Sequence, residues 1–207
     1  MLFRLLLTLP FLLLASAGPA QAAPALWQVS DEDSSIWLFG SVHLLRADTN
    51  WRSPELDKVL SKAERVYFET DLSVEAQMAM LPLSFELGFN RDGRLLSDII
   101  GAELTDRVRD AAGRYAIPMA TLLTMKPWMA ATTLSTGPLL ESGYEAAHGV
   151  EAVLAAELNE HRLGFLETPE QQLNFLAGGS LEEQIAMLEG TLDTLDVMQS
   201  DIDEMVR

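Results

Sequence analysis

The chain has 207 residues and a formal charge of −17, from 14 Lys and Arg against 31 Asp and Glu, and it contains no cysteine. Its hydrophobic fraction of 48% is enough to build a core, which excludes a disordered acidic tail. The acidic balance disfavours nucleic acid and anionic lipid as partners, since both attract a basic face. The lack of cysteine excludes a disulfide framework, a thiol nucleophile and a thiolate zinc site.

Residues 1–22 have the pattern of a secretory signal peptide. Arg4 supplies a basic start, an apolar run follows over residues 5–15, and residues 20–22 (AQA) form a small-x-small cleavage site. The apolar run is about half of the ~20 residues that span a bilayer, so we expect cleavage and no stable membrane anchor. The mature protein, residues 23–207, is then expected in the periplasm or outside the cell.

Strands are predicted where short runs are rich in β-branched and aromatic residues. These runs cover residues 25–30, 35–40, 65–70 and 162–166. The first two are separated by the polar residues 31–34, a pattern typical of a hairpin.

Helices are predicted where apolar residues recur at helical spacing, over residues 54–64, 75–87, 104–115, 118–136, 149–160 and 181–205. A capping box from Thr168 to Gln171 opens a further helix. We expect a break or a kink at Pro82, and breaks at Gly101 and Lys126-Pro127. The order of elements predicts an α/β fold, with a central sheet, flanking helices and an inserted helical subdomain at about 73–147.

Three of the predicted strands lead into side chains capable of chemistry. His43 follows the second strand, Glu69 lies near the end of the third, and Glu167 ends the fourth. Ligands of open α/β sheets bind at the carboxyl ends of the strands, so parallel neighbours would bring these side chains together. Imidazole and carboxylate groups can hold a divalent metal, and a remaining carboxylate can act as general base. Each residue also has a simpler explanation; Glu167, for example, suits the N-terminus of the next helix.

Further polar residues lie near these positions in the chain. His148 precedes the helix at 149–160, and Glu151 falls in its first turn, where a negative charge is favourable without any other role. Arg46 follows His43 and can either bind an acidic substrate or pair with a neighbouring carboxylate. Five methionines either line a ligand groove or, as we expect, pack in a core: Met78, Met80, Met119, Met125 and Met129.

Five segments, in order, resemble the TraB/GumN family, which groups with the Tiki metalloproteases and the ChaN-like haem-binding proteins. No nucleophile elbow, P-loop, dinucleotide fingerprint or H-E-x-x-H motif competes with this resemblance. The segments are SIWLFGSVHLL (35–45), RVYFETDL (65–72), KPW (126–128), HGVEAVLAAE (148–157) and LGFLETPEQQLNFL (163–176).

The resemblance implies an α/β fold with its site at the strand ends. In the Tiki branch, the histidine and glutamate that match His43 and Glu69 belong to a metal-dependent peptidase site. We therefore expect an exported metal-dependent hydrolase, with His43 and Glu69 as ligands of Mn, Zn or Co. Glu69 and Glu167 would act in catalysis on a peptide or small molecule, with Glu167 as a further ligand or as the base. Arg46, His148 and Glu151 would support the ligands or contact the substrate.

One part of the family pattern is missing. A second G-x-x-H motif, preceded by an Arg-Asn segment, belongs in a C-terminal strand, and residues 201–207 instead continue a helical pattern. We therefore expect the sequence to be truncated at its C-terminus, with a genuinely short variant as the alternative. Two other functions stay open: an extracytoplasmic haem or metal carrier without turnover, and an accessory protein of polysaccharide export.

Overall fold

The computed structural model describes residues 24–205, so the predicted signal peptide lies outside the described part of the chain. In chain order the elements are β1 (Leu26–Ser30), β2 (Ser35–Phe39), α1 (Pro54–Lys62), β3 (Val66–Phe68), α2 (Val74–Gly88), α3 (Leu96–Arg114), α4 (Met119–Leu122), α5 (Pro127–Glu141), η1 (Ala146–His148), α6 (Val150–Glu157), η2 (Glu160–Arg162), β4 (Leu163–Phe165), α7 (Pro169–Ala177) and α8 (Leu181–Met205). This mixture of helices and strands confirms the predicted α/β class.

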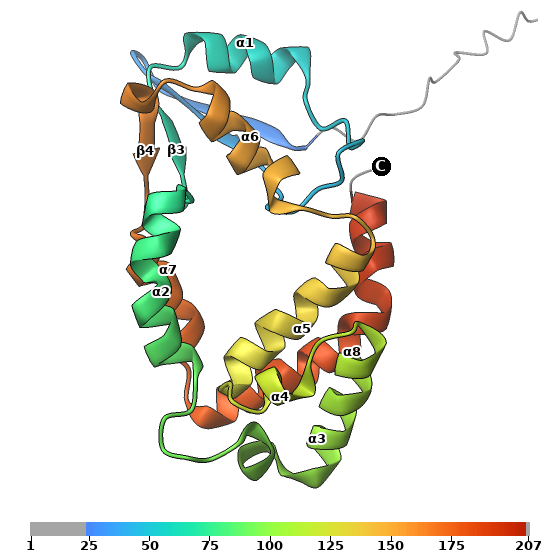
Figure 1. Cartoon of the computed structure of the whole chain (residues 1–207). Helices are drawn as coiled ribbons and strands as arrows, with labels where there is room; N and C mark the ends of the chain where they lie inside the picture. The colour runs from blue at the N-terminus through green and yellow to red at the C-terminus, as the bar shows by residue number, and fades with distance from the viewer. Residues whose placement is uncertain (1–23, 206–207) are drawn as a thin grey trace, which may run out of the picture.

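The described chain has two parts (Figure 1). The strands gather at one end with α1 and α6, and α3, α4, α5 and α8 form a helical part at the other end. Helices α2 and α7 lie side by side and connect the two parts along one side. Within residues 24–205, no helix combines the length and the apolar character needed to cross a bilayer.

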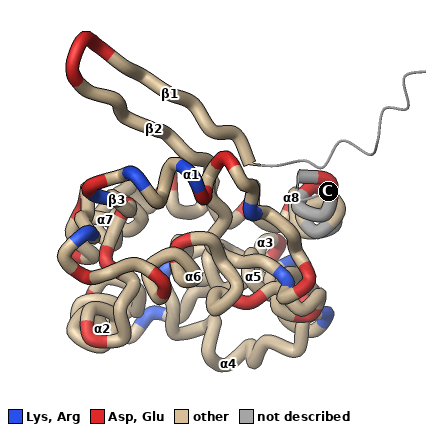
Figure 2. Tube along the Cα trace, turned by 90° about the horizontal axis from the view of Figure 1, so that it is seen from above, with Lys and Arg blue, Asp and Glu red and all other residues tan. Residues whose placement is uncertain are grey.

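The sheet component is small, with two strands in each of two sheets among the described residues. Strands β1 and β2 form the predicted antiparallel hairpin, with Leu26 opposite Phe39. The carboxylate of Asp31 tightens the turn by accepting from the backbone N–H of Ser34 at 2.8 Å. Figure 2 shows the hairpin projecting from the body with acidic residues at its tip. Strands β3 and β4 pair in parallel, with Val66 opposite Leu163.

A small core lies beneath the strands. It is built from Leu45, Phe68, Val150 and Leu154, which come from the loop after β2, from β3 and from α6. Helix α1 joins this part through Arg162 of η2, whose guanidinium donates to the carbonyls of Leu60 and Ala63 at 2.5 and 2.6 Å. These bonds satisfy carbonyls at the end of α1 that lack partners within the helix.

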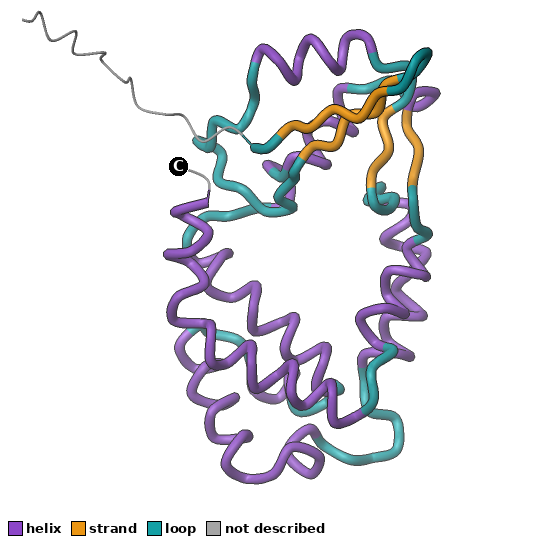
Figure 3. Tube along the Cα trace, turned by 180° about the vertical axis from the view of Figure 1, so that it is seen from behind, coloured by secondary structure: helices purple, strands orange, loops and turns teal. Residues whose placement is uncertain are grey.

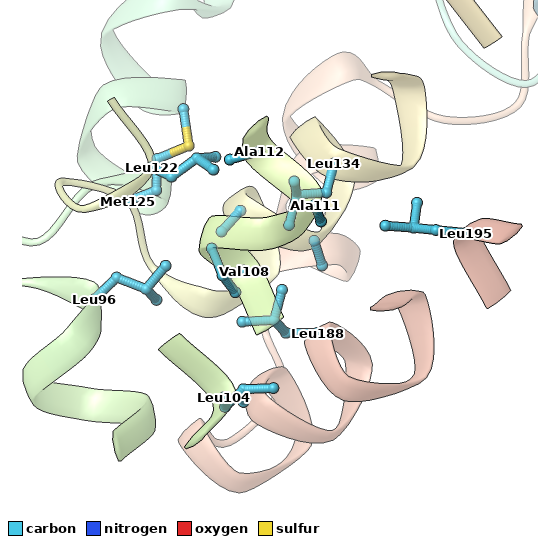
Figure 4. Close-up of a cluster of buried hydrophobic side chains, with 12 residues drawn as sticks. Leu96, Leu104, Val108, Ala111, Ala112, Leu122, Met125, Leu134, Leu188 and Leu195 are labelled. Carbon is cyan, nitrogen blue, oxygen red and sulfur yellow. The ribbon is translucent and has the colours of Figure 1, made fainter. Parts of the chain in front are cut away.

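The larger core belongs to the helical part (Figure 4). Leu96, Val108, Leu122, Leu134 and Leu188 are completely buried in it, and they come from α3, α4, α5 and α8. Helix α8 packs along α5, so residues 181–205 build this part together with α3, α4 and α5. Two of the predicted interruptions are confirmed: Gly101 has φ +77° inside α3, and α5 starts anew at Pro127.

Two details distinguish the connecting helices α2 and α7. Helix α2 runs through Pro82, so the expected break does not end the helix there. The missing N–H of proline removes one internal bond, and this helix is mostly exposed, so water can satisfy the carbonyl left without a partner. Helix α7 begins with the predicted capping box, in which Thr168 accepts from the N–H of Gln171 at 3.1 Å.

Candidate functional site

The candidate site is centred on His43, which lies in the loop after β2 and is bound by the first turn of α6. Nδ1 of His43 lies 3.2 Å from Oε1 of Glu151. The carboxylate of Glu151 is almost completely enclosed, with 8% of its side chain exposed, whereas half of the His43 side chain reaches solvent. The imidazole is therefore held on its buried side and free to interact on its outer side.

Glycine at position 149 allows the start of α6 to lie against the backbone of His43. A Cβ built on Gly149 would lie 2.6 Å from the carbonyl carbon of His43 and closer still to the carbonyl oxygen. The next residue, Val150, donates its N–H to the carbonyl of Val42 at 3.1 Å. Each residue of the G-V-E sequence thus has its own role. Gly149 allows the close contact with His43, Val150 bonds to the backbone of Val42, and Glu151 places its carboxylate against the imidazole.

Ser41 completes the buried side of the site, and sequence reasoning did not single it out. Its hydroxyl donates to Oε1 of Glu151, the oxygen that also faces His43. The hydroxyl points at a carboxylate and not at the imidazole, which is not the arrangement of a serine nucleophile activated by histidine. Its position two residues before His43, inside the G-x-x-H motif, was the available signal.

These contacts shift the ionisation of both partners. The hydrogen bond to Glu151 raises the pKa of His43 above its ordinary value, and this outweighs the opposing effect of burial. Burial would raise the pKa of Glu151, but hydrogen bonds from His43 and Ser41 together lower it. The first turn of a helix also favours a negative charge. The second oxygen of Glu151, Oε2, is buried without a hydrogen-bond partner.

Glu69 lies on the outer side of His43. Its Oε2 is 4.0 Å from Nε2 of His43, and 62% of its side chain is exposed. Glu167 is placed beside it through the backbone, since the N–H of Glu167 donates to the carbonyl of Glu69 at 2.8 Å. The parallel pairing of β3 and β4, seen in Figure 3 as two strands that lead into helices, produces this juxtaposition.

The other two sequence candidates, Arg46 and His148, contact carboxylates outside the group of His43, Glu69 and Glu151. The guanidinium of Arg46 forms a two-pronged contact with Asp48, at 3.1 and 3.2 Å, as the pairing interpretation predicts. His148 lies 3.8 Å from the carboxylate of Glu145 in the preceding turn. His148 adjoins Gly149 in sequence, so it flanks the site.

The residues present fit a divalent metal as a partial set of ligands. Nε2 of His43 and the carboxylate of Glu69 are the two candidate ligands, and Glu151 holds the other nitrogen of the imidazole, as carboxylates do behind metal-bound histidines. Among the described residues, no three His, Asp or Glu side chains are arranged to hold a metal ion. A closed structural site needs four protein ligands. Two protein ligands fit an ion that keeps several water molecules in its coordination shell.

One hollow of the described surface lies away from the His43 group. It has a volume of about 380 Å³ and is lined by α1 and α6 residues, among them Leu60 and Leu154. Arg52 at its edge bridges Asp57 and Glu157, each at 2.6 Å, so its charge is already matched. His43, Glu69 and Glu151 do not line this hollow.

The sequence model of the TraB/PrgY/gumN family matches residues 25–207. The chain belongs to this family. The match to the TraB/PrgY/gumN family covers all the residues that form the site, from Ser41 to Glu167. No curated protein and no solved structure gives a significant match to the chain.

Proposed function

We propose that this member of the TraB/PrgY/gumN family is an exported metal-dependent hydrolase that acts on polypeptides. One observation carries the proposal: Glu151 holds Nδ1 of His43 while Nε2 is directed toward Glu69. The signal-peptide pattern over residues 1–22 supports export, and the sequence resemblance to the Tiki metalloproteases supports a peptide substrate.

The residues of the chain have distinct tasks in this proposal. When the imidazole of His43 is neutral, Glu151 keeps the proton on Nδ1 and leaves a lone pair at Nε2 for a ligand. Ser41 donates its hydroxyl to the same carboxylate oxygen of Glu151 that faces His43, and so helps to fix the carboxylate. His43 and Glu69 would hold a divalent metal, whose Lewis acidity would activate a water near neutral pH and polarise a carbonyl. Glu167, at the neighbouring strand end, is the carboxylate available to accept a proton.

Metal titration of the full chain tests the proposal. After metal removal, Mn²⁺ and Zn²⁺ are titrated by calorimetry into the wild type, His43→Ala and Glu69→Gln. We expect one site, weakened at least tenfold by either substitution. His161→Ala is the matched control, because His161 is exposed and outside the site. Absence of binding, or equal effects of His43→Ala and His161→Ala, would refute the proposal.

A metal carrier without turnover is the second candidate. This function is favoured by the number of candidate ligands: the site offers two, whereas catalytic zinc sites usually have three ligands from the protein. Incubation with a library of quenched fluorescent peptides separates the two functions. Metal-dependent cleavage that Glu69→Gln abolishes supports hydrolysis, whereas bound metal without cleavage supports carriage. Haem carriage gains less support, because Met119, Met125 and Met129 pack in the helical core.

A further inference from the structure

Helix α2 carries an exposed apolar stripe. Val74, Met78, Leu81 and Phe85 recur at spacings of four, three and four residues, so they share one face of the helix. Their exposed fractions are 71%, 62%, 45% and 56%. The less exposed residues Ala76 and Met80 are offset from Val74 and Met78 by two positions, about 200° around the helix.

This stripe differs from an ordinary solvent-facing surface. Over its 15 residues α2 has no Lys or Arg, and its only acidic residues are Glu75 and Glu86, near its two ends. A helix that is apolar all round is normally buried. Contiguous apolar patches on the surface of a soluble protein generally mark an interaction site. The exposed apolar face of α2 is therefore a candidate interaction surface.

The charge around the stripe indicates which occupant fits. No Lys or Arg occurs in residues 66–90, which form β3 and α2, or in residues 163–180, which form β4 and α7. The same two segments contain six carboxylates: Glu69, Asp71, Glu75, Glu86, Glu167 and Glu170. A second copy of the chain would bring like charges together, because Glu75 and Glu86 flank the stripe. A partner with an apolar stripe and basic residues is complementary to both features.

The stripe also starts at the candidate site. Val74 is five residues after Glu69, and both α2 and α7 begin where the two strands end (Figure 1). A polypeptide lying along α2 would thus reach Glu69 and Glu167 at its end. An amphipathic segment laid with its apolar face on a helix surface is a common mode of peptide recognition.

We propose that the stripe Val74–Met78–Leu81–Phe85 is a docking surface for a basic amphipathic polypeptide segment, which it presents to Glu69. The docking stands on the surface alone, and only its role as substrate presentation rests on the proposed function. Two synthetic peptides of identical Leu and Lys content serve as probes. In one, Leu recurs at i, i+4, i+7 and i+11, and in the other the order is scrambled.

Fluorescence anisotropy with the metal-free full chain measures the affinity at physiological salt. We expect the patterned peptide to bind at least tenfold more tightly than the scrambled one. The double variant Met78→Gln/Leu81→Gln, which preserves charge and helix propensity, should lose at least tenfold in affinity for the patterned peptide. Leu140→Gln on α5 is the matched control, since Leu140 is also exposed, at 58%, and should leave binding unchanged.

Three results would overturn the docking surface. The first is equal affinity for the two peptides, which would mean attraction by charge alone. The second is equal affinity of wild type and the double variant. The third is a wild-type dimer in sedimentation that the double variant abolishes, which would make a second copy the occupant. The peptide-binding assay contains no metal, so its result does not depend on metal binding. A failure of metal binding or cleavage would refute the proposed function and would leave the docking surface untouched.

Discussion

The backbone of Gly149 lies against the carbonyl group of His43 at a distance that leaves no room for a Cβ. This contact brings the start of α6 onto the loop after β2, although the two segments are far apart in the sequence. Glu151 reaches the imidazole because the helix begins there. The site thus depends on one close approach between two backbones.

Replacing Gly149 by Ala should therefore disrupt the site. The methyl group would meet backbone atoms of His43, which cannot move as a flexible side chain can. We expect a loss of about 1–3 kcal/mol in the free energy of unfolding, as for other overpacked positions. Urea denaturation measures it. Gly190→Ala is the control: its Cβ meets no atom within 4 Å inside α8, and the change should stabilise by about 0.5–1 kcal/mol. Equal effects of the two changes would contradict the steric explanation.

Replacing Glu151 by Gln should lower the pKa of His43. The hydrogen bond and the negative charge of Glu151 are the main causes that raise this pKa in the metal-free protein, and the substitution removes the charge. Proton NMR titration of the three histidines measures the change. Glu103→Gln, an exposed substitution on α3 with the same change of charge, should leave the His43 titration in place. A pKa of His43 that is unaltered by Glu151→Gln would disprove the coupling.

The same pair predicts how stability depends on pH in the metal-free protein. The pKa of His43 is raised from 6.5, so its contribution is complete below 6.5 and is lost as the pH rises through the folded-state value. The pKa of Glu151 is lowered from 4.5, so its contribution is present above 4.5 and is lost as the pH falls through the folded-state value. The stability difference between wild type and Glu151→Gln should thus be largest between pH 4.5 and 6.5. Urea denaturation across this range checks it, and a flat difference would contradict it.

Removing a core side chain should destabilise the helical part. Leu134 is completely buried in α5, and Leu134→Ala should cost about 2–5 kcal/mol in the free energy of unfolding. Leu140→Ala on the same helix should change it by less than about 0.5 kcal/mol, because Leu140 is exposed. Thermal and urea denaturation compare the two. Similar costs at both positions would show that the core is placed wrongly.

Much of the local structure could be predicted from the sequence. The hairpin of β1 and β2, the capping box at Thr168, the restart at Pro127 and the long helix 181–205 all follow from patterns within a few residues. The choice between a break and a continuing helix at Pro82 could not, because the cost of a proline depends on whether water can satisfy the carbonyl left without a partner. Local propensity carries no information on that exposure.

The residue types that follow the strands could be identified from the sequence: His43, Glu69 and Glu167. Which of these side chains meet depends on contacts between distant segments. The parallel pairing of β3 and β4 places Glu167 beside Glu69 through the backbone, while His43 arrives from a loop outside that sheet and is held by Glu151. The physical reason is that strand pairing and the close contact at Gly149 are interactions between distant segments, which periodicity and spacing along the chain do not encode.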